Sequence, residues 1–309
     1  MIQRFKRSWE IFNLSFDVLM RNKKLLVFPM VTMVCTVFIF IFFFGAIVFQ
    51  PTGHSYTDKA HWNTVMSSMF EDGTNLEDSS SRDKAAFSEK GMWIVAIAYF
   101  LSMFLATFFN VAFFHEIFDA IQGNRVSVRE GLQFAMSRLP QILMWSLFAG
   151  LIGYLIRALE ERLPLFGKIM VGIIGMLWSV ASIFAIPVMI MNQNVTSPMA
   201  ILKSSAQTLK KSWGESLAGF TGLSVLMAIP IFMIVPISAL SAFFVSQGMS
   251  PFVVSGVLML WILLAIPFMY VVGVAGNIFK CSLYLYATTG NLPGGFTQDQ
   301  MNSVWKFKK

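Results

Sequence analysis

The sequence is poor in charge. Asp, Glu, Lys and Arg make up only 13% of its 309 residues, whereas hydrophobic residues make up 56% and include 32 Phe and 21 Met. A soluble domain usually carries about 25% charged residues. A chain of this composition has too little polar surface to cover its apolar side chains in water. The composition therefore excludes an ordinary soluble protein and indicates that lipid solvates much of the chain.

Cysteine is also scarce. The two cysteines are Cys35, in the first hydrophobic run, and Cys281, at the end of the last. They should lie at different depths or in reduced surroundings, so we expect no structural disulfide. A cleavable signal peptide is not predicted either, because the first apolar run begins only at Leu25 and no small-residue cleavage site follows at a useful distance. We expect this run to stay in place as an anchor.

The sequence contains several long stretches without any charged residue. A membrane-spanning helix needs about 20 apolar residues, and turn residues at 246–251 divide the longest stretch in two. The sequence therefore predicts an all-α integral membrane protein, with residues 1–309 as a single membrane domain. The six predicted spans are residues 25–49, 92–114, 140–156, 169–191, 217–245 and 252–279.

The distribution of Lys and Arg predicts the orientation of these spans. Most of the 23 basic residues lie before residue 25, in the segments 115–139 and 192–215, and after residue 279, whereas the segment 51–91 is net acidic. Basic residues favour the cytoplasmic side. We therefore expect both termini in the cytoplasm, an extracytoplasmic loop at 51–91 with a short helix around Trp62 to Phe70, and a cytoplasmic tail at 280–309.

Basic amphipathic stretches precede the first, third and fifth spans. Residues 1–24 are predicted to form an interfacial helix, since apolar residues recur on one face at Ile2, Phe5, Trp9, Phe12, Phe16 and Leu19. Such helices lie at the headgroups, so we expect membrane lipids, and anionic inner-leaflet headgroups in particular, as partners. The predicted interfacial anchors are Arg4, Lys6, Arg7, Trp9, Lys210, Lys211 and Trp213. The pattern favours three parallel copies of an interfacial helix followed by two spans.

The tripeptide Ala-Ile-Pro recurs in the last three spans. It places Pro187, Pro230 and Pro267 within apolar helices, and Pro236 adds a second proline to the fifth span. Proline removes a helix hydrogen bond and bends the helix, which can open a cavity or a hinge. The alternative is that these prolines only reflect how common proline is in membrane helices.

The most enzyme-like string contains His115, Glu116 and Asp119, just after the second span. His115 and Asp119 share a helix face, but a metallopeptidase motif would have a second histidine in place of Asp119. The other histidines, His54 and His61, are predicted on the opposite side of the membrane. The favoured interpretation is a His–Asp pair at the end of a span, and the three residues are only weak candidates for catalysis. No nucleophile elbow, phosphate loop or dinucleotide fingerprint is present, so no enzyme activity, cofactor or metal is predicted.

The predicted span cores contain no charged residue. Ion-coupled carriers usually hold such groups within the membrane, which argues against a coupled carrier. Asn110 is the deepest strongly polar side chain, and Asn277 also lies near an inner end. An apolar or lipid-like cargo, or a pore lined by backbone and hydroxyls, stays open. The net charge of +7 follows from the positive inner face, so nucleic acid is not an expected partner.

Three short motifs carry a resemblance. They are Arg-Ser-Trp at 7–9, Leu-Lys-Ser-Ser at 202–205 followed by Lys-Lys-Ser-Trp at 210–213, and Ala-Thr-Thr-Gly at 287–290. The chain resembles, outside residues 51–91, an uncharacterised bacterial family of six-span membrane proteins of unknown function. It is more loosely similar to the membrane domain attached to some glycerophosphodiester phosphodiesterases. The first resemblance implies a bacterial inner (plasma) membrane, and the second implies no activity, because the catalytic domain is absent.

The leading hypothesis is a non-enzymatic inner-membrane protein that forms a channel-like assembly or a bundle that handles a lipid or another apolar molecule. The alternative is a membrane scaffold or assembly partner of another membrane complex, and either role allows a homo-oligomer. An intramembrane enzyme that uses His115, Glu116 and Asp119 is the least favoured.

Overall fold

The computed structural model describes residues 15–70, 88–192, 195–211, 213–248 and 250–289, and the elements in this part are all helices. Residues 15–21 are helical and lead into a short 3-10 helix, η1. The elements are η1 (Lys23–Leu26), α2 (Val27–Val48), α3 (Lys59–Met69), α4 (Glu89–Ile121), α5 (Val128–Ser137), α6 (Leu139–Arg162), α7 (Leu165–Ala181), α8 (Ala185–Met191), α9 (Pro198–Lys211), α10 (Trp213–Ser246) and α11 (Pro251–Thr289).

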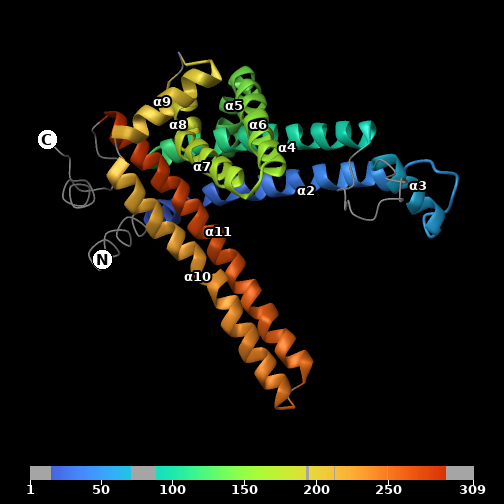
Figure 1. The fold of residues 1–309 in the computed structure, drawn as a ribbon. Coiled ribbons are helices and arrows are strands. Elements are labelled where there is room, and N and C mark those ends of the chain that lie inside the picture. The colour runs from blue at the N-terminus through green and yellow to red at the C-terminus, as the bar shows by residue number, and fades with distance from the viewer. Residues whose placement is uncertain (1–14, 71–87, 193–194, 212, 249, 290–309) are drawn as a thin grey trace.

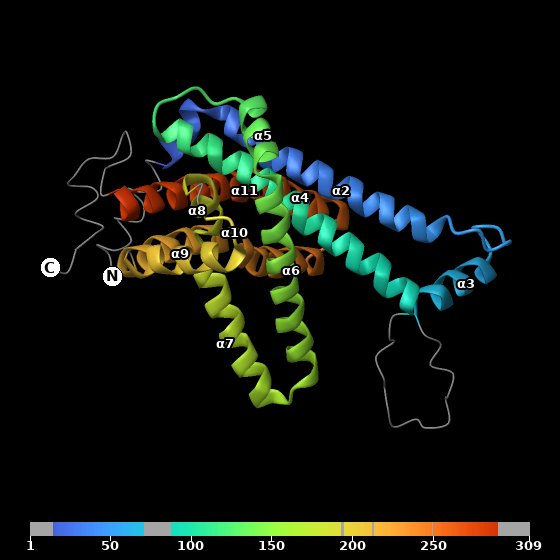
Figure 2. The same cartoon turned by 90° about the horizontal axis from the view of Figure 1, so that it is seen from above.

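The long helices pack as three pairs. α2 lies against α4, α6 against α7, and α10 against α11. The three pairs leave a common junction in three different directions (Figures 1 and 2). α4 is the central element of this junction, because it also contacts α5, α6, α8 and α11. Three pairs in this order agree with the predicted architecture, while the internal repeat stays a prediction.

The hydrophobic core lies at the junction and not along the paired helices. It contains the last part of α4, the start of α6, the last part of α11, and the short helices α5, α8 and α9. Ile117, Ile142, Val188, Ile201 and Ile278 are all fully buried there. The chain therefore has its soluble-like core at one end, on the side that the basic residues predict to be cytoplasmic.

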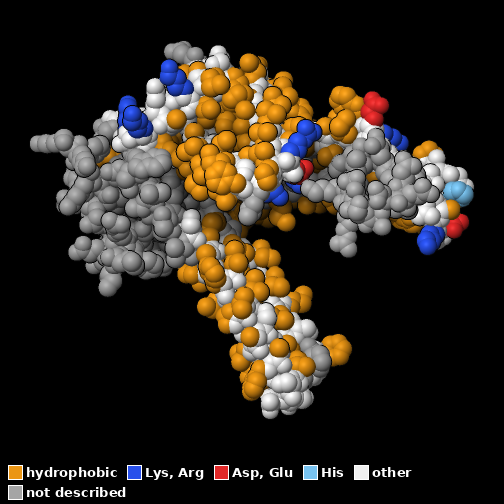
Figure 3. All heavy atoms as spheres, in the orientation of Figure 1, with side chains coloured by type: hydrophobic (Ala, Val, Ile, Leu, Met, Phe, Trp, Pro, Cys, Tyr) orange, Lys and Arg blue, Asp and Glu red, His pale blue; other side chains and the backbone are white. Residues whose placement is uncertain are grey.

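Six helical segments are long and apolar enough to cross a membrane, which confirms the predicted membrane fold. They are Lys23–Val48, Glu89–Ile121, Leu139–Arg162, Phe166–Met191, Met227–Ser246 and Val254–Thr289. At most 22% of the residues in the most apolar stretch of any segment are buried within the chain. Figure 3 shows hydrophobic side chains along the α10–α11 pair from the junction to its tip. Surface of this kind requires lipid or another protein around it.

Several helices run beyond the predicted spans. α4 continues to Ile121 instead of ending near residue 114, α6 continues to Arg162 instead of 156, and α11 continues to Thr289. α11 has 39 residues, which corresponds to about 58 Å at about 1.5 Å per residue, against about 30 Å of hydrocarbon. The extensions of α4 and α11 are buried at the junction, where Ile121 and Leu283 are in the core. Packing against other helices stabilises these extensions. The hydropathy of a single segment gives no information about such packing.

The short helices α5 and α9 occupy the positions predicted for amphipathic helices. Part of each apolar face packs within the protein, because Ala135 of α5 and Ile201 of α9 are fully buried, whereas Met136 and Met199 are exposed. The expected contact of these helices with headgroup lipid stays a prediction. Lys210 and Lys211 are exposed at the end of α9, and Trp213 begins α10. Arg4, Lys6, Arg7 and Trp9 lie outside the described residues.

The four prolines occupy two kinds of position. Pro187 lies in the first turn of α8, directly after an interruption of the fourth span between Ala181 and Ala185. Because proline has no N–H, helical pairing across this point is incomplete. Pro230 and Pro236 lie within α10, and Pro267 lies within α11. Bends at these three positions stay a prediction.

The segment between α2 and α4 contains the predicted short helix, α3. His61 of this helix is fully buried. Its Nε2 lies 2.9 Å from the carbonyl oxygen of Val48, and its Nδ1 lies 2.6 Å from the hydroxyl of Thr52. A carbonyl only accepts, so Nε2 carries the proton and Nδ1 is free to accept from Thr52. His61 therefore ties α3 to the end of α2.

Candidate functional site

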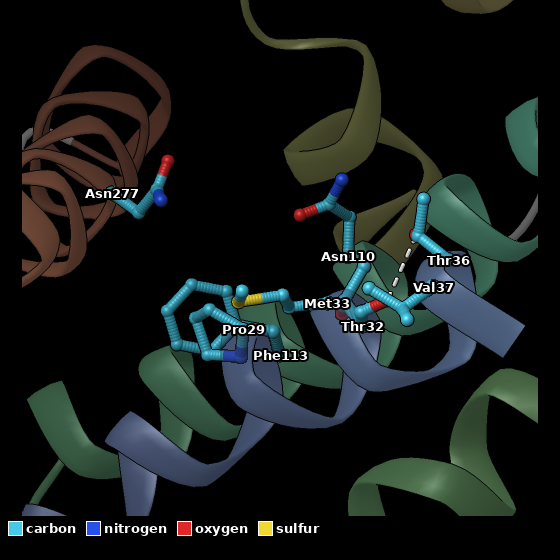
Figure 4. A pocket seen from close by; sticks show the side chains of 8 residues that line it. All are labelled: Pro29, Thr32, Met33, Thr36, Val37, Asn110, Phe113 and Asn277. Atoms are coloured by element: carbon cyan, nitrogen blue, oxygen red, sulfur yellow. Dashed lines mark hydrogen bonds between the residues drawn. The ribbon is translucent and has the colours of Figure 1, made fainter. Parts of the chain in front are cut away.

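A cavity of about 380 Å³ lies between α2, α4 and α11 near the junction. Figure 4 shows its lining side chains, with Asn110 of α4 and Asn277 of α11 facing the same space. The lining residues are Pro29, Thr32, Met33, Thr36, Val37, Asn110, Phe113 and Asn277. Neutral amides and hydroxyls supply its polar groups, and the rest of the lining is apolar.

The two threonine hydroxyls in this cavity donate hydrogen bonds to backbone carbonyls of their own helix, α2. Thr32 donates to the carbonyl of Phe28 and Thr36 donates to the carbonyl of Thr32, each at 2.9 Å. Back-bonding of this kind uses the hydroxyl proton and leaves oxygen lone pairs free to accept. α2 therefore offers hydrogen-bond acceptors to a molecule in the cavity.

The amides supply donors. Among the described residues, Asn110 has no hydrogen-bond partner, and Asn277 only accepts, at 3.5 Å, from Nζ of Lys280. Each asparagine carries two N–H donors. Polar groups that are shielded from water are normally hydrogen-bonded. The N–H groups of these two asparagines are not, so they are available to a ligand.

Lys280 lies beside the cavity on α11. It is half-buried, and its Nζ lies 5.5 Å from the ring centroid of Phe114. Across the described chain no carboxylate lies within ion-pair distance of this ammonium. The site therefore combines neutral donors with one cation that lacks an anionic partner.

The cavity lies on the membrane side of the predicted inner edge of the hydrocarbon layer. The predicted spans end at residues 114 and 279. Asn110 and Asn277 lie just inside this edge, and Lys280 lies just outside it. Met33 and Val37 lie further into the membrane along α2. The amides and the cation thus lie at the end of the cavity near the predicted headgroups, and the deeper part on α2 is apolar except for Thr36.

The predicted chemical cluster forms a second site at the end of α4. Nδ1 of His115 lies 3.4 Å from Oε1 of Glu116 and 3.5 Å from Oδ2 of Asp119. Glu116 is fully buried, and its Oε2 accepts a 2.5 Å hydrogen bond from the backbone N–H of Ser127, the residue before α5. The structure therefore brings the three predicted residues together and gives Glu116 a structural role at the start of α5.

Sequence reasoning identified Asn110 and Asn277 as unusually deep polar residues but did not place them together. It missed Thr32 and Thr36, because threonine is ordinary in membrane helices. One signal for the cavity is present in the sequence. Asn110 and Asn277 both lie close to the predicted ends of their spans, at residues 114 and 279.

Comparison with known proteins gives one match. A family model described as a family of unknown function (DUF6159) matches residues 90–295. No curated protein and no solved structure matches the chain, and nothing among these comparisons supports the similarity to glycerophosphodiester phosphodiesterases. The matched segment contains α4 and α11, and therefore Asn110, Asn277, Lys280 and the His115 cluster, but not α2.

Proposed function

The chain belongs to DUF6159, a family of unknown function, and we propose that it is a lipid-handling protein of the bacterial inner membrane, with both termini in the cytoplasm. The cavity between α2, α4 and α11 holds part of an inner-leaflet lipid. The observation that carries this proposal is the combination, at the inner end of the cavity, of two available amides and one cation, Lys280, that has no anionic partner among the described residues.

Lipid chemistry matches this order of groups. Amide N–H groups of Asn110 and Asn277 can donate to the ester carbonyls of a glycerolipid, and Lys280 can bind its phosphate. The acyl chains then lie against Met33 and Val37, toward the membrane centre. The cavity volume falls within the range of about 300–1,000 Å³ that is usual for ligand pockets, and the longer part of the lipid lies along exposed apolar helix surface.

Native mass spectrometry of the purified full chain tests this function. The protein is reconstituted in nanodiscs that contain phosphatidylglycerol and phosphatidylcholine, and the lipids that stay bound after release are counted. The double variant Asn110→Leu/Asn277→Leu keeps side-chain size but removes four N–H donors. We expect it to lose at least about 90% of the bound lipid, because each pairing of an amide donor with a carbonyl is worth about 1 kcal/mol and the loss of two lowers the affinity about 30-fold.

Two further variants sharpen the result. Lys280→Met should abolish the preference for the anionic lipid, whereas Lys203→Met, at an exposed position of α9, should not change it. Asn192→Leu, at the exposed end of α8, is the matched control for the asparagines. Equal lipid occupancy of the wild type and of the Asn110/Asn277 variant would reject the proposal.

A second candidate function, an assembly partner in a larger membrane complex, is favoured by a different observation. The three helix pairs diverge and leave apolar helix surface uncovered by the chain. Such surface suits a second copy or another membrane protein as well as lipid. Cross-linking in intact membranes tests this candidate, since it requires a specific protein adduct to helices α6, α7, α10 or α11.

A further inference from the structure

We propose that His115, Glu116 and Asp119 form a divalent metal site that joins the end of α4 to the start of α5. The three ligand atoms are Nδ1, Oε1 and Oδ2, and they lie within 4.8 Å of one another. This site lies apart from the lipid cavity and is independent of the proposed lipid function.

Two of the distances between the ligand atoms suit metal coordination. Nδ1 of His115 lies 3.4 Å from Glu116 and 3.5 Å from Asp119, whereas a good N–H···O hydrogen bond has its heavy atoms about 2.9–3.0 Å apart. Ligands about 2.0–2.1 Å from a tetrahedral zinc ion lie about 3.3–3.4 Å from one another. The cluster therefore already has two of the separations that a tetrahedral metal site needs.

Each carboxylate has one oxygen held by a donor from outside the cluster and the other oxygen turned to His115. The backbone N–H of Ser127 donates to Oε2 of Glu116, and the side-chain amide of Asn124 donates to Oδ1 of Asp119 at 3.2 Å. Outer partners of this kind fix the ligand atoms of metal sites. Here they leave Oε1 and Oδ2 as the free ligand atoms.

The burial of Glu116 favours a bound cation, because the carboxylate lies away from solvent. Its side chain is 0% exposed, and in the described part of the chain Oε1 contacts no donor except His115. A buried carboxylate without a compensating charge is costly. The only ion-pair partner of Glu116 in the described residues is the imidazole of His115. A divalent ion compensates both carboxylates at once.

α5 packs against the cluster and holds it rigid. The ring of Phe134 lies 4.0 Å from the ring of His115. Gly131 lies so close to Glu116 that a Cβ at 131 would be 2.8 Å from its Cγ. His115 and Asp119 keep about a quarter of their side chains exposed, which leaves an entry path and room for a water ligand.

One imidazole and two carboxylates suit zinc or cobalt better than magnesium, which prefers oxygen alone. Coordination through Nδ1 requires this nitrogen to lack a proton. In the neutral ring the proton is then on Nε2, and an imidazolium releases one proton to solvent when the metal binds.

Titration with Co²⁺ of the metal-free full chain in detergent tests the site. The wild type should bind one ion with visible absorption bands of tetrahedral or five-coordinate Co²⁺ and should lose them when Zn²⁺ is added. Asp119→Asn should weaken binding by about tenfold or more, and it keeps the Oδ1 that accepts from Asn124. His115→Phe keeps the ring contact with Phe134 and should weaken binding at least as much.

His54→Ala is the matched control, because His54 is exposed at the opposite end of α2 and should leave the Co²⁺ affinity unchanged. If either cluster variant fails to fold, the other still tests the site, and circular dichroism with size-exclusion elution reports the fold. Wild-type binding no tighter than that of Asp119→Asn, or absent altogether, would overturn the proposal. Because lipid occupancy is measured separately on Asn110 and Asn277, failure of one proposal does not decide the other.

Discussion

The backbone N–H of Phe184 donates a 3.0 Å hydrogen bond to the hydroxyl of Ser205, and both residues are fully buried. Phe184 lies in the interruption of the fourth span, between the end of α7 at Ala181 and the start of α8 at Ala185. Ser205 belongs to α9. The break between α7 and α8 leaves the N–H of Phe184 without a helical partner in the core. Ser205 of α9, the next helix in the sequence, accepts its hydrogen bond instead.

Ser205→Ala should destabilise the protein by about 1–3 kcal/mol, because the N–H of Phe184 then stays buried without a partner. Thermal unfolding in detergent, followed by circular dichroism, measures the loss. Ser204→Ala is the control, since the side chain of Ser204 is only half-buried and makes no hydrogen bond among the described residues. Equal unfolding temperatures for the two variants would contradict this assignment.

Gly131→Ala should destabilise the junction by about 1–3 kcal/mol through overpacking. The new Cβ would lie 2.8 Å from Cγ of Glu116 and 2.9 Å from the carbonyl of Ala112, and backbone atoms give way poorly. Gly172→Ala, with nothing within 4 Å of its Cβ position, should be neutral or slightly stabilising. The same unfolding measurement compares them, and a neutral Gly131→Ala would mean that α5 does not pack on α4 as described.

His61→Ala should loosen the outer end of the α2–α4 pair without unfolding the junction. It removes the contacts to Val48 and Thr52, and the junction core lies at the other end of these helices. Hydrogen exchange should rise in residues 48–70 and stay unchanged in α5 and α9. His54→Ala, which alters an exposed side chain, should change neither region. A global rise in exchange for His61→Ala would be evidence against this local role.

Orientation can be measured with cysteines in a chain that carries Cys35→Ser and Cys281→Ala. Asn63→Cys, exposed on α3, should react with a membrane-impermeant maleimide added to intact bacteria. Lys203→Cys, exposed on α9, should react only after the membrane is opened. This pattern follows from the excess of basic residues on the side that the sequence predicts to be cytoplasmic. The reverse pattern would place the cavity in the outer leaflet and would refute the proposed inner-leaflet ligand.

Much of the fold was predictable because membrane spans obey local rules. Each span must be long and apolar by itself, so the six spans and the helices before the third and fifth could be located without tertiary information. The turn at 246–251 was predictable for a similar reason, and Gly248 within it has the positive φ of 86° that favours glycine.

The ends of the helices were not predictable in this way. Leu283 of α11 lies beyond the predicted span, and its burial depends on α11 packing against other helices at the junction. The covering of Ile201 in α9 by protein instead of lipid has the same origin. An amphipathic pattern reports that a face is buried, but not which apolar medium covers it.

The sequence by itself determined that this chain has six segments long and apolar enough to cross a membrane, because solvation acts on each segment separately. Only the tertiary structure decided that Asn110 and Asn277 face one cavity and that Glu116 is buried beneath α5. These relationships join helices that are distant in sequence, and they depend on how α4 packs at the junction.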